Sequence, residues 1–271
     1  MSKKIFLDYQ STTPVSDKVL KKMLPYFSEK FANPHSNNHS LGRETNEVVE
    51  KNREQVAKLI NAETNEIIFT SGGTEADNLA LNSAVRDLGV RRIITSEIEH
   101  HAVLYCVNQL KDCFDIEVEY VKLTAEGEVD LEDLGNRLEH SDVKTLVSLM
   151  HVNNEVGNKL DIKKVALLCK QNNALFHSDT VQSIGHYELD LKEIPVDFTA
   201  VSAHKFHGPK GVGFAFIRKN SGLKPLIFGG EQERGYRAGT EGLHNIVGLE
   251  EAFKLAYQNL EEEKTYTMAL K

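Results

Sequence analysis

Residues 198–217 of the chain read FTAVSAHKFHGPKGVGFAFI and hold two short apolar runs joined by a polar loop. The runs, 198–201 and 213–217, contain the β-branched and aromatic residues that favour strands. Between them lies Lys205, flanked by a histidine and a phenylalanine. The stretch therefore predicts two strands joined by a loop that carries a candidate reactive amine.

Similar strand-like runs recur along the chain, and segments with helical periodicity separate most of them. The other runs lie at 67–69, 92–95, 118–121, 145–149 and 175–177. Strands that alternate with helices indicate a mostly parallel sheet covered by helices on both faces. The chain is thus expected to have an α/β fold.

Composition and charge narrow the classes of function. The 271 residues are 40% hydrophobic and 27% charged, which is typical of a folded globular protein. With 32 Lys+Arg against 40 Asp+Glu, the net charge of −8 and the lack of a basic cluster disfavour nucleic-acid binding. No run approaches the roughly 20 apolar residues of a membrane span, and no signal peptide is recognisable, so we expect a cytoplasmic protein. The three cysteines lack C-x-x-C spacing and are expected to be reduced.

A glycine-rich turn, Ser71-Gly72-Gly73-Thr74, follows the run at 67–69 and precedes a helical pattern. Glycines let the backbone approach a ligand closely, and the free N–H groups of a new helix suit a phosphate. The turn matches neither the P-loop nor the G-x-G-x-x-G pattern. An ordinary capped turn fits this segment equally well.

Two further candidates follow strands. Asp179 comes after the run at 175–177, where a desolvated carboxylate needs a cation such as a protonated heterocyclic nitrogen; capping of a helix is the alternative. Partial desolvation of Lys205 would lower its pKa and expose the neutral amine that forms Schiff bases. Lys210 is interpreted as a surface lysine. His204 and His207 lack a third ligand at suitable spacing, so no metal site is predicted.

A phosphate cradle, an acid for a ring nitrogen and a lysine for an aldehyde are the three groups that pyridoxal phosphate requires. The order of the motifs resembles the cysteine desulfurases, in the class V aminotransferase group of fold-type I pyridoxal-phosphate enzymes. The resemblance runs along essentially the whole chain. The matching segments are 7–14, 33–36, 70–78, 99–103, 150–157, 177–182, 202–205 and 229–240.

The resemblance implies a role for each matching residue. Lys205 would hold the cofactor covalently, Asp179 would pair with the pyridine nitrogen, and His100 would stack on the ring and assist proton transfer. The phosphate would lie against Gly73, Thr74, Ser202 and His204, and the ring oxygen side against Asn154 and Gln182. Thr240 would reach the phosphate of a neighbouring subunit, which implies a homodimer.

Some neighbouring residues leave alternatives open. His101 is interpreted as a solvated residue at a helix start, and Asn154 is preferred to Asn153. Arg234 and Arg237 either bind phosphate or pair with acids such as Glu231 and Glu233.

The family removes sulfur from L-cysteine, leaving alanine and a cysteine persulfide that serves iron–sulfur cluster assembly or tRNA thiolation through an acceptor protein. The resemblance places the sulfur-accepting cysteine and a substrate-binding arginine beyond Lys271. Cys106, Cys113 and Cys169 are interpreted as packing residues. We therefore expect a truncated member that binds the cofactor and turns over cysteine poorly. The same residues would fit a selenocysteine lyase, another class V lyase, or a non-catalytic dimer partner.

The expected domain organisation follows from the same comparison. Residues 1–15 form an N-terminal arm, 16–245 the large cofactor-binding domain, and 246–271 the start of a helix leading to a small domain that is largely missing. The face formed by Ile246, Leu249 and Phe253 is expected to be exposed, because nothing follows to cover it.

Overall fold

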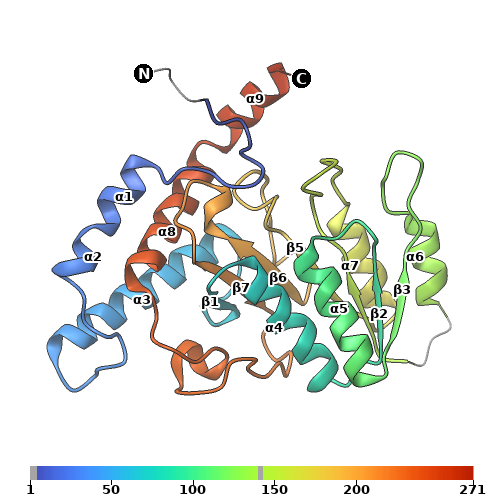
Figure 1. The fold of residues 1–271 in the computed structure, drawn as a ribbon, viewed down its shortest axis with the longest axis horizontal. Coiled ribbons are helices and arrows are strands. Elements are labelled where there is room, and N and C mark those ends of the chain that lie inside the picture. Colours follow the sequence, from blue (N-terminus) through green and yellow to red (C-terminus); the bar gives the residue numbers. More distant parts are fainter. Residues whose placement is uncertain (1–4, 140–142, 271) are drawn as a thin grey trace.

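The computed structural model describes residues 5–139 and 143–270, and seven strands in these ranges form one sheet (Figure 1). The strands are β1 Ile67–Thr70, β2 Arg92–Thr95, β3 Glu117–Tyr120, β4 Thr145–Ser148, β5 Leu175–Asp179, β6 Phe198–Ser202 and β7 Gly213–Ile217. Their order is β1-β7-β6-β5-β4-β2-β3. Strands β2 to β6 pair in parallel, whereas β7 runs antiparallel to β1 and β6. The predicted mostly parallel sheet is confirmed, strand by strand.

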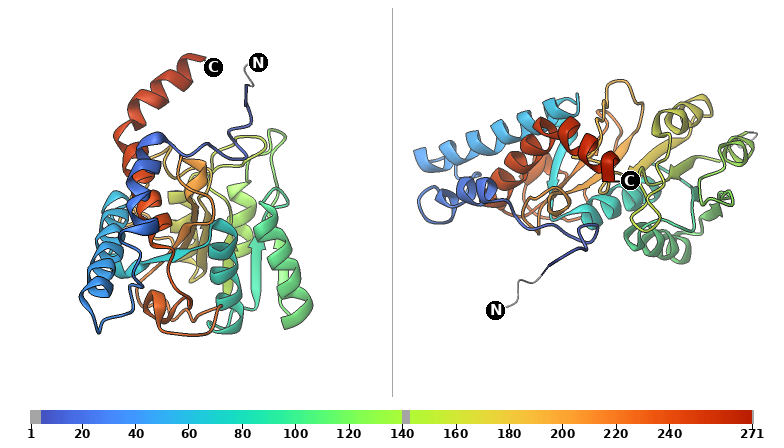
Figure 2. Two further views of the ribbon diagram at one scale, coloured as in Figure 1. Left: turned by 60° about the vertical axis from the view of Figure 1, so that its left-hand side comes forward. Right: turned by 90° about the horizontal axis from the view of Figure 1, so that it is seen from above.

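Helices cover both faces of this sheet. The helices of the described residues are α1 Asp17–Met23, α2 Pro25–Ser28, α3 Ser40–Leu59, α4 Gly73–Arg86, α5 His101–Phe114, α6 Leu131–Leu138, α7 Ile162–Gln171, α8 Leu243–Gln258 and α9 Leu260–Leu270, with short 3-10 turns η1 Thr64–Glu66, η2 Ala203–Lys205 and η3 Gln232–Gly235. Along β7, Phe214 and Phe216 join the core beneath α3, α6, α7 and α8, while Ala215 and Ile217 join the core beneath α4 and α5. This alternation gives the sheet two buried faces (Figure 2).

The expected exposure of the final apolar face was wrong. Ile246, Leu249 and Phe253 on α8 are 2%, 0% and 0% exposed, because α8 packs against α3 and α1. Periodicity identifies an apolar helix face but not the element that covers it, and here the cover comes from the other end of the chain. Figure 2 shows that α9, in contrast, projects beyond the sheet and its helices. The proposed division at residue 245 stays a prediction.

Strand β7 approaches the glycine-rich turn so closely that residue 213 must lack a side chain. A Cβ at Gly213 would lie 2.0 Å from the carbonyl oxygen of Val201 and 2.8 Å from the Cα of Gly72. We expect Gly213→Ala to destabilise the fold by about 1–3 kcal/mol, because the strand would have to move away from β6. Denaturant unfolding measures this loss.

Gly135 provides a matched control, since a Cβ there meets nothing within 4 Å and the residue lies within α6. Gly135→Ala should be neutral or stabilising by up to about 1 kcal/mol, because alanine favours helices. Equal unfolding midpoints for the two variants would show that the contact at Gly213 is not constraining.

Candidate functional site

A cavity of about 180 Å³ lies where β5 and β6 end and α4 begins. The residues that line it are Ser11, Gly73, Thr74, Asp77, His100, Met150, Asn154, Asp179, Val181, Gln182, Ser202, His204 and Lys205. Every residue that the sequence suggested for the site, except Thr240, is among them. Tertiary structure adds Ser11, Asp77, Met150 and Val181, to which the sequence assigned no role. Ligands of open α/β sheets bind at this edge, outside the carboxyl ends of the strands.

The N-terminus of α4 forms one end of the cavity. Gly72 precedes the helix at φ 150°, and no side chain caps the helix. A Cβ at Gly73 would lie 2.5 Å from Cγ2 of Val181, so glycine lets this turn sit against the opposite wall. Uncapped N–H groups at a helix start attract an anion, and Ser202 and His204 line the same space. This end has the chemistry to hold a phosphate.

Lys210 lies closer to this end than expected. Its side chain is exposed, as predicted for a surface lysine, yet it lines an adjoining cavity that shares Gly73, Ser202 and His204 with the first. In the sequence, Lys210 stands in the turn Gly208-Pro209-Lys210-Gly211, and this local sequence does not show which residues lie near Lys210 in space.

Asp179 is the last residue of β5 and is 5% exposed. Its Oδ1 accepts a hydrogen bond from the Val181 N–H at 2.8 Å. Burial, and then the charge of Asp77, raise the pKa of Asp179 to about 7. A turn follows β5 instead of a helix, so the helix-cap alternative was wrong. A cation in the cavity would restore the ionised carboxylate, which is the fit expected for a protonated ring nitrogen.

Lys205 ends the short turn η2 and is about half-buried. Its Nζ donates hydrogen bonds to the carbonyl oxygens of Gln10 and Ser11, the latter at 3.1 Å, so the N-terminal segment holds the amine in place. Burial lowers the pKa of Lys205, while the carboxylates of Asp179 and Asp8 oppose this shift. The predicted desolvation of this lysine is confirmed.

His100 precedes α5 as its N-cap residue, and its Nδ1 accepts a hydrogen bond from the Ala102 N–H at 3.1 Å. This bond fixes the ring at the rim of the cavity. His101 instead stacks on Tyr105 with 4.8 Å between ring centroids and is exposed, as the solvated interpretation requires.

Of the two neighbouring asparagines, Asn154 and not Asn153 lines the cavity, in agreement with the preference stated from the sequence. Asn154 lines the cavity, whereas Asn153 is buried, donates to the carbonyl of Ile98 at 2.6 Å and accepts two backbone N–H groups. Asn153 thus holds its own loop. Gln182 also lines the cavity and donates to the carbonyl of Gln10 at 3.0 Å.

Thr240 and the two arginines are not among the residues that line the cavity. Thr240 is exposed and is not among the lining residues. Arg237 pairs with Glu75 at 2.8 Å and Arg234 pairs with Glu50 at 2.6 Å. The arginines therefore pair with acids, although not with the neighbouring ones that the sequence suggested.

The cysteines are packing residues in two of three cases. Cys106 and Cys169 are buried, and burial raises the pKa of the Cys106 thiol to about 12. Cys113 is exposed in the last turn of α5, so the packing interpretation was wrong for this residue. None of the three lines the cavity. In residues 5–139 and 143–270 no group of His, Cys, Asp and Glu could hold a metal ion, and no helix is long and apolar enough to cross a membrane.

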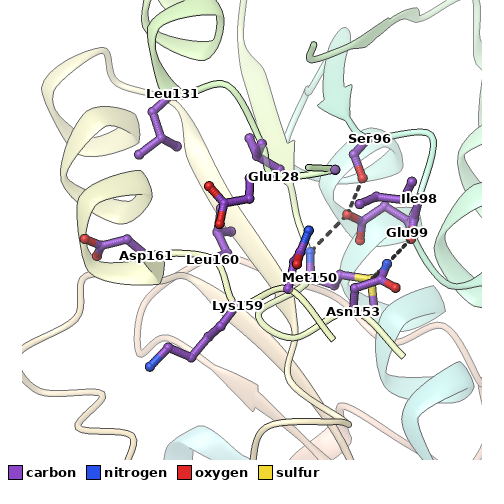
Figure 3. Close-up of a pocket in the computed structure, with 13 residues that line it drawn as sticks. Ser96, Ile98, Glu99, Glu128, Leu131, Met150, Asn153, Lys159, Leu160 and Asp161 are labelled. Atoms are coloured by element: carbon purple, nitrogen blue, oxygen red, sulfur yellow. Dashed lines mark hydrogen bonds between the residues drawn. The ribbon is translucent and has the colours of Figure 1, made fainter. Parts of the chain in front are cut away.

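Figure 3 shows a second cavity, of about 180 Å³. It shares Met150 with the first. Its lining residues come from the segments that follow β2 and β4 and from the stretch that leads from β3 into α6. Oε1 of Glu99 accepts hydrogen bonds from Ser96 Oγ at 2.8 Å and from the Met150 N–H at 3.1 Å. Burial raises the pKa of Glu99 to about 8, so this acid is mostly protonated at neutral pH. Glu99 thus ties together the loops that carry His100 and Asn154.

Comparison with known proteins gives one consistent result. The sequence profile described as aminotransferase class-V matches residues 5–270. The chain is 46% identical over 267 residues to "Cysteine desulfurase IscS" of Clostridium botulinum (strain Kyoto / Type A2), covering 97% of this chain and 66% of the relative. It is 46% identical over 264 residues to "Putative cysteine desulfurase IscS 1" of Bacillus subtilis (strain 168), covering 96% of this chain and 68% of the relative.

Solved structures agree with this relationship. A "NIFS-LIKE PROTEIN" matches with a TM-score of 0.90 and 41% identity, over 96% of this chain and 71% of that chain. "SspA in complex with cysteine" matches with a TM-score of 0.87 and 33% identity, over 93% and 72%. The chain spans about two thirds of the length of the relatives it matches. With its fold, its cavity and these similarities in agreement, the chain belongs to the class V aminotransferase family, in the branch of the cysteine desulfurases.

Proposed function

We propose that the protein is a pyridoxal-phosphate-dependent cysteine desulfurase and that this chain provides its cofactor site. The observation that carries the proposal is the meeting of Asp179, Lys205 and the uncapped start of α4 around one cavity. Pyridoxal phosphate, when bound, withdraws electrons from the substrate carbon next to the amino group. Side chains of the protein would bind the cofactor and transfer protons.

Each wall of the cavity suits one part of the cofactor. The N–H groups of α4, with Ser202 and His204, would bind the phosphate, and Asp179 would bind the ring nitrogen. Asn154 and Gln182 would bind the ring oxygen side, and His100 would cover the ring. Lys205 Nζ would hold the aldehyde carbon and, once released by substrate, would accept and return a proton beside it.

We propose L-cysteine as the substrate and an iron–sulfur scaffold or tRNA-thiolation protein as the sulfur acceptor. Support comes from the names of the relatives and from the related structure described in complex with cysteine. Because the described cysteines lie outside the cavity, the thiol that first takes the sulfur is one other than Cys106, Cys113 and Cys169. The cytoplasmic location expected from the sequence stays a prediction.

We also propose a homodimer in which Thr240 completes the phosphate site of the partner subunit. The exposure of Thr240, outside the cavity of its own chain, supports this arrangement. Thr240→Ala should then weaken phosphate-dependent cofactor binding without affecting unfolding of the monomer. If light scattering shows that the protein is a monomer, and this monomer binds the cofactor with full affinity in a titration, the proposed homodimer is contradicted.

Borohydride reduction tests the proposed function. The chain is incubated with excess pyridoxal phosphate, reduced, digested and analysed by mass spectrometry, and we expect one pyridoxyl adduct, on the peptide that contains Lys205. Addition of L-cysteine, but not of L-serine, should change the absorption of the bound cofactor, and alanine should form slowly when a dithiol accepts the sulfur. Absence of the adduct would reject the proposal for this chain. If the adduct forms but L-cysteine causes no response, the proposed cofactor is supported and L-cysteine is rejected as the substrate.

Covalent attachment of the cofactor should depend on pH through Lys205. Attachment needs the neutral amine, and burial lowers the pKa of this group below its ordinary value of 10.5. The attachment rate should therefore rise with pH, with a midpoint below pH 10.5, and level off above that midpoint. Absorbance measured over a pH series gives this midpoint, with free Nα-acetyl-lysine as the reference. A midpoint at or above that of the reference would contradict the prediction.

A further inference from the structure

An acidic side chain, Glu75, lies at the end of the cavity that has the chemistry to hold a phosphate. It stands in the first turn of α4, which begins after Gly72, and it lines the adjoining cavity together with Ser202 and His204. A carboxylate in the first turn of a helix is favourable in itself, because it meets the positive end of the helix dipole. Beside a negatively charged phosphate, however, the same carboxylate repels the group that this end would bind.

Glu75 is bound on two sides. Its Oε2 accepts a hydrogen bond from the Ser71 N–H at 2.8 Å, which ties the carboxylate to the glycine-rich turn. Arg237 Nε donates to Oε1 at 2.8 Å, and Arg237 Nη2 donates to Oε2 at 3.3 Å. The pair is therefore bidentate, the geometry in which an arginine binds a carboxylate most strongly. The side chains of Arg237 and Glu75 are 22% and 11% exposed, so solvent screens their interaction only in part.

This pairing keeps Glu75 ionised while balancing its charge. Burial by itself would raise the pKa of Glu75, but the hydrogen bonds from Arg237 and Ser71 bring it below the ordinary value of 4.5. A guanidinium stays charged at any ordinary pH. The carboxylate and the guanidinium together carry no net charge, so the start of α4 keeps its attraction for an anion.

Two other acids act on Arg237, and each has a partner of its own. Glu233 is held by the buried guanidinium of Arg53. Glu241 is hydrogen-bonded to Nε2 of His35 at 2.7 Å. The guanidinium of Arg237 is thus left for the carboxylate at the phosphate end.

We propose that Arg237 is a positioning residue that lets the phosphate end of the cavity accept an anion. It acts through Glu75, whose charge it balances and whose carboxylate it holds against the Ser71 N–H. The N–H groups at the start of α4 then face the phosphate without an opposing charge beside them. This inference rests on the proposed function and adds an ion pair within one subunit that does not touch the reacting atoms.

Arg237→Ala and Glu75→Gln test the inference separately and together. Arg237→Ala leaves the carboxylate unpaired, and affinity for pyridoxal phosphate should fall about tenfold, the effect of one opposing charge at short range. Glu75→Gln is uncharged and its amide oxygen can still accept from Ser71, so affinity should stay within about threefold of wild type or increase. Adding Glu75→Gln to Arg237→Ala should restore most of the loss, because the opposing charge is gone. Titration followed by the absorbance of the bound cofactor gives each affinity.

Pyridoxal, which lacks the phosphate, separates charge from packing. Its attachment to Lys205, measured by borohydride reduction and peptide mass analysis, should be the same in wild type and in Arg237→Ala. Arg234→Ala is the matched control: Arg234 belongs to the same segment and pairs with Glu50 at 2.6 Å, yet it lines neither cavity. Its loss should leave the affinity for both compounds unchanged.

The outcomes distinguish this inference from the proposed function. Failure of the wild-type chain to bind pyridoxal phosphate would overturn both. When wild type binds, an unchanged affinity in Arg237→Ala, or equal losses for pyridoxal phosphate and pyridoxal, would overturn the inference alone. A double variant no better than Arg237→Ala would likewise overturn it. A tenfold loss in Glu75→Gln would do so too, and this arm decides even where Arg237→Ala does not fold.

Discussion

Replacing Lys205 with alanine is expected to abolish covalent retention of pyridoxal phosphate. The pyridoxyl adduct should fall to background after borohydride reduction, and any formation of alanine from L-cysteine should fall by at least about 100-fold, the contribution of a positioned acid–base group. The reason is local: Nζ of Lys205 is the amine held inside the cavity, fixed by the carbonyls of Gln10 and Ser11. Peptide mass analysis gives the first readout and amino-acid analysis the second.

Reversible binding should survive this substitution. Asp179, Ser202 and the start of α4 are intact in Lys205→Ala, so the variant should still bind the cofactor, with lower affinity and without the covalent bond. Lys210→Ala is the control, because Lys210 is exposed and lines only the adjoining phosphate end. Its adduct on Lys205 should persist. Loss of the adduct in Lys210→Ala but not in Lys205→Ala would reverse the assignment of the two lysines.

The largest expected loss of stability follows from removal of Glu233. Glu233 accepts two hydrogen bonds from the guanidinium of Arg53, the one from Nη2 at 2.9 Å, and a third from the Phe69 N–H at 2.7 Å. Both side chains of the ion pair are 1–2% exposed. Glu233→Ala leaves a buried guanidinium without its main counter-charge and should destabilise the fold by about 3–5 kcal/mol.

This ion pair also holds the backbone of η3. Glu233 and Arg234 adopt φ 47° and 57°, in the left-handed region that non-glycine residues rarely occupy. The carboxylate of Glu233 joins this turn to α3 through Arg53 and to β1 through Phe69. We therefore expect Glu233→Ala to loosen the segment that leads to Thr240, and limited proteolysis should cut near that segment first.

Denaturant unfolding measures the loss, with Glu261→Ala as the control. Glu261 is exposed on α9 and pairs with Lys264 at 3.5 Å, so its removal should leave the unfolding midpoint unchanged. Replacing both Arg53 and Glu233 with methionine should cost less than either single change, because no unpaired charge stays buried. A double variant as unstable as the sum of its singles would show that the pair acts by shape and not by charge.

Local pattern was enough to predict the strands and several walls of the cavity. The runs at 67–69 and 198–201 became β1 and β6, because alternation and β-branched residues report burial on a sheet. Asp179 and Lys205 could be proposed because each lies at or just after the carboxyl end of a strand, where parallel strands place their loops at one edge. The motif resemblance then supplied residues such as Asn154 and Gln182.

Pairings across the chain could not be predicted in this way. Arg237 and Glu75 are 162 residues apart, Glu233 and Arg53 are 180 apart, and α8 is covered by elements from the other end of the chain. Each of these residues has an ordinary local sequence, since a Glu in a helix or an Arg on a long helix is usually solvated.

The sequence by itself thus determined the α/β fold, the family and most of the residues that line the cavity. Tertiary structure alone decided which carboxyl groups are desolvated together, which arginine pairs with Glu75, and that the apolar face of α8 is buried. The physical reason is that strand and helix periodicity depend on near neighbours in the chain, whereas desolvation and charge coupling depend on distance in space.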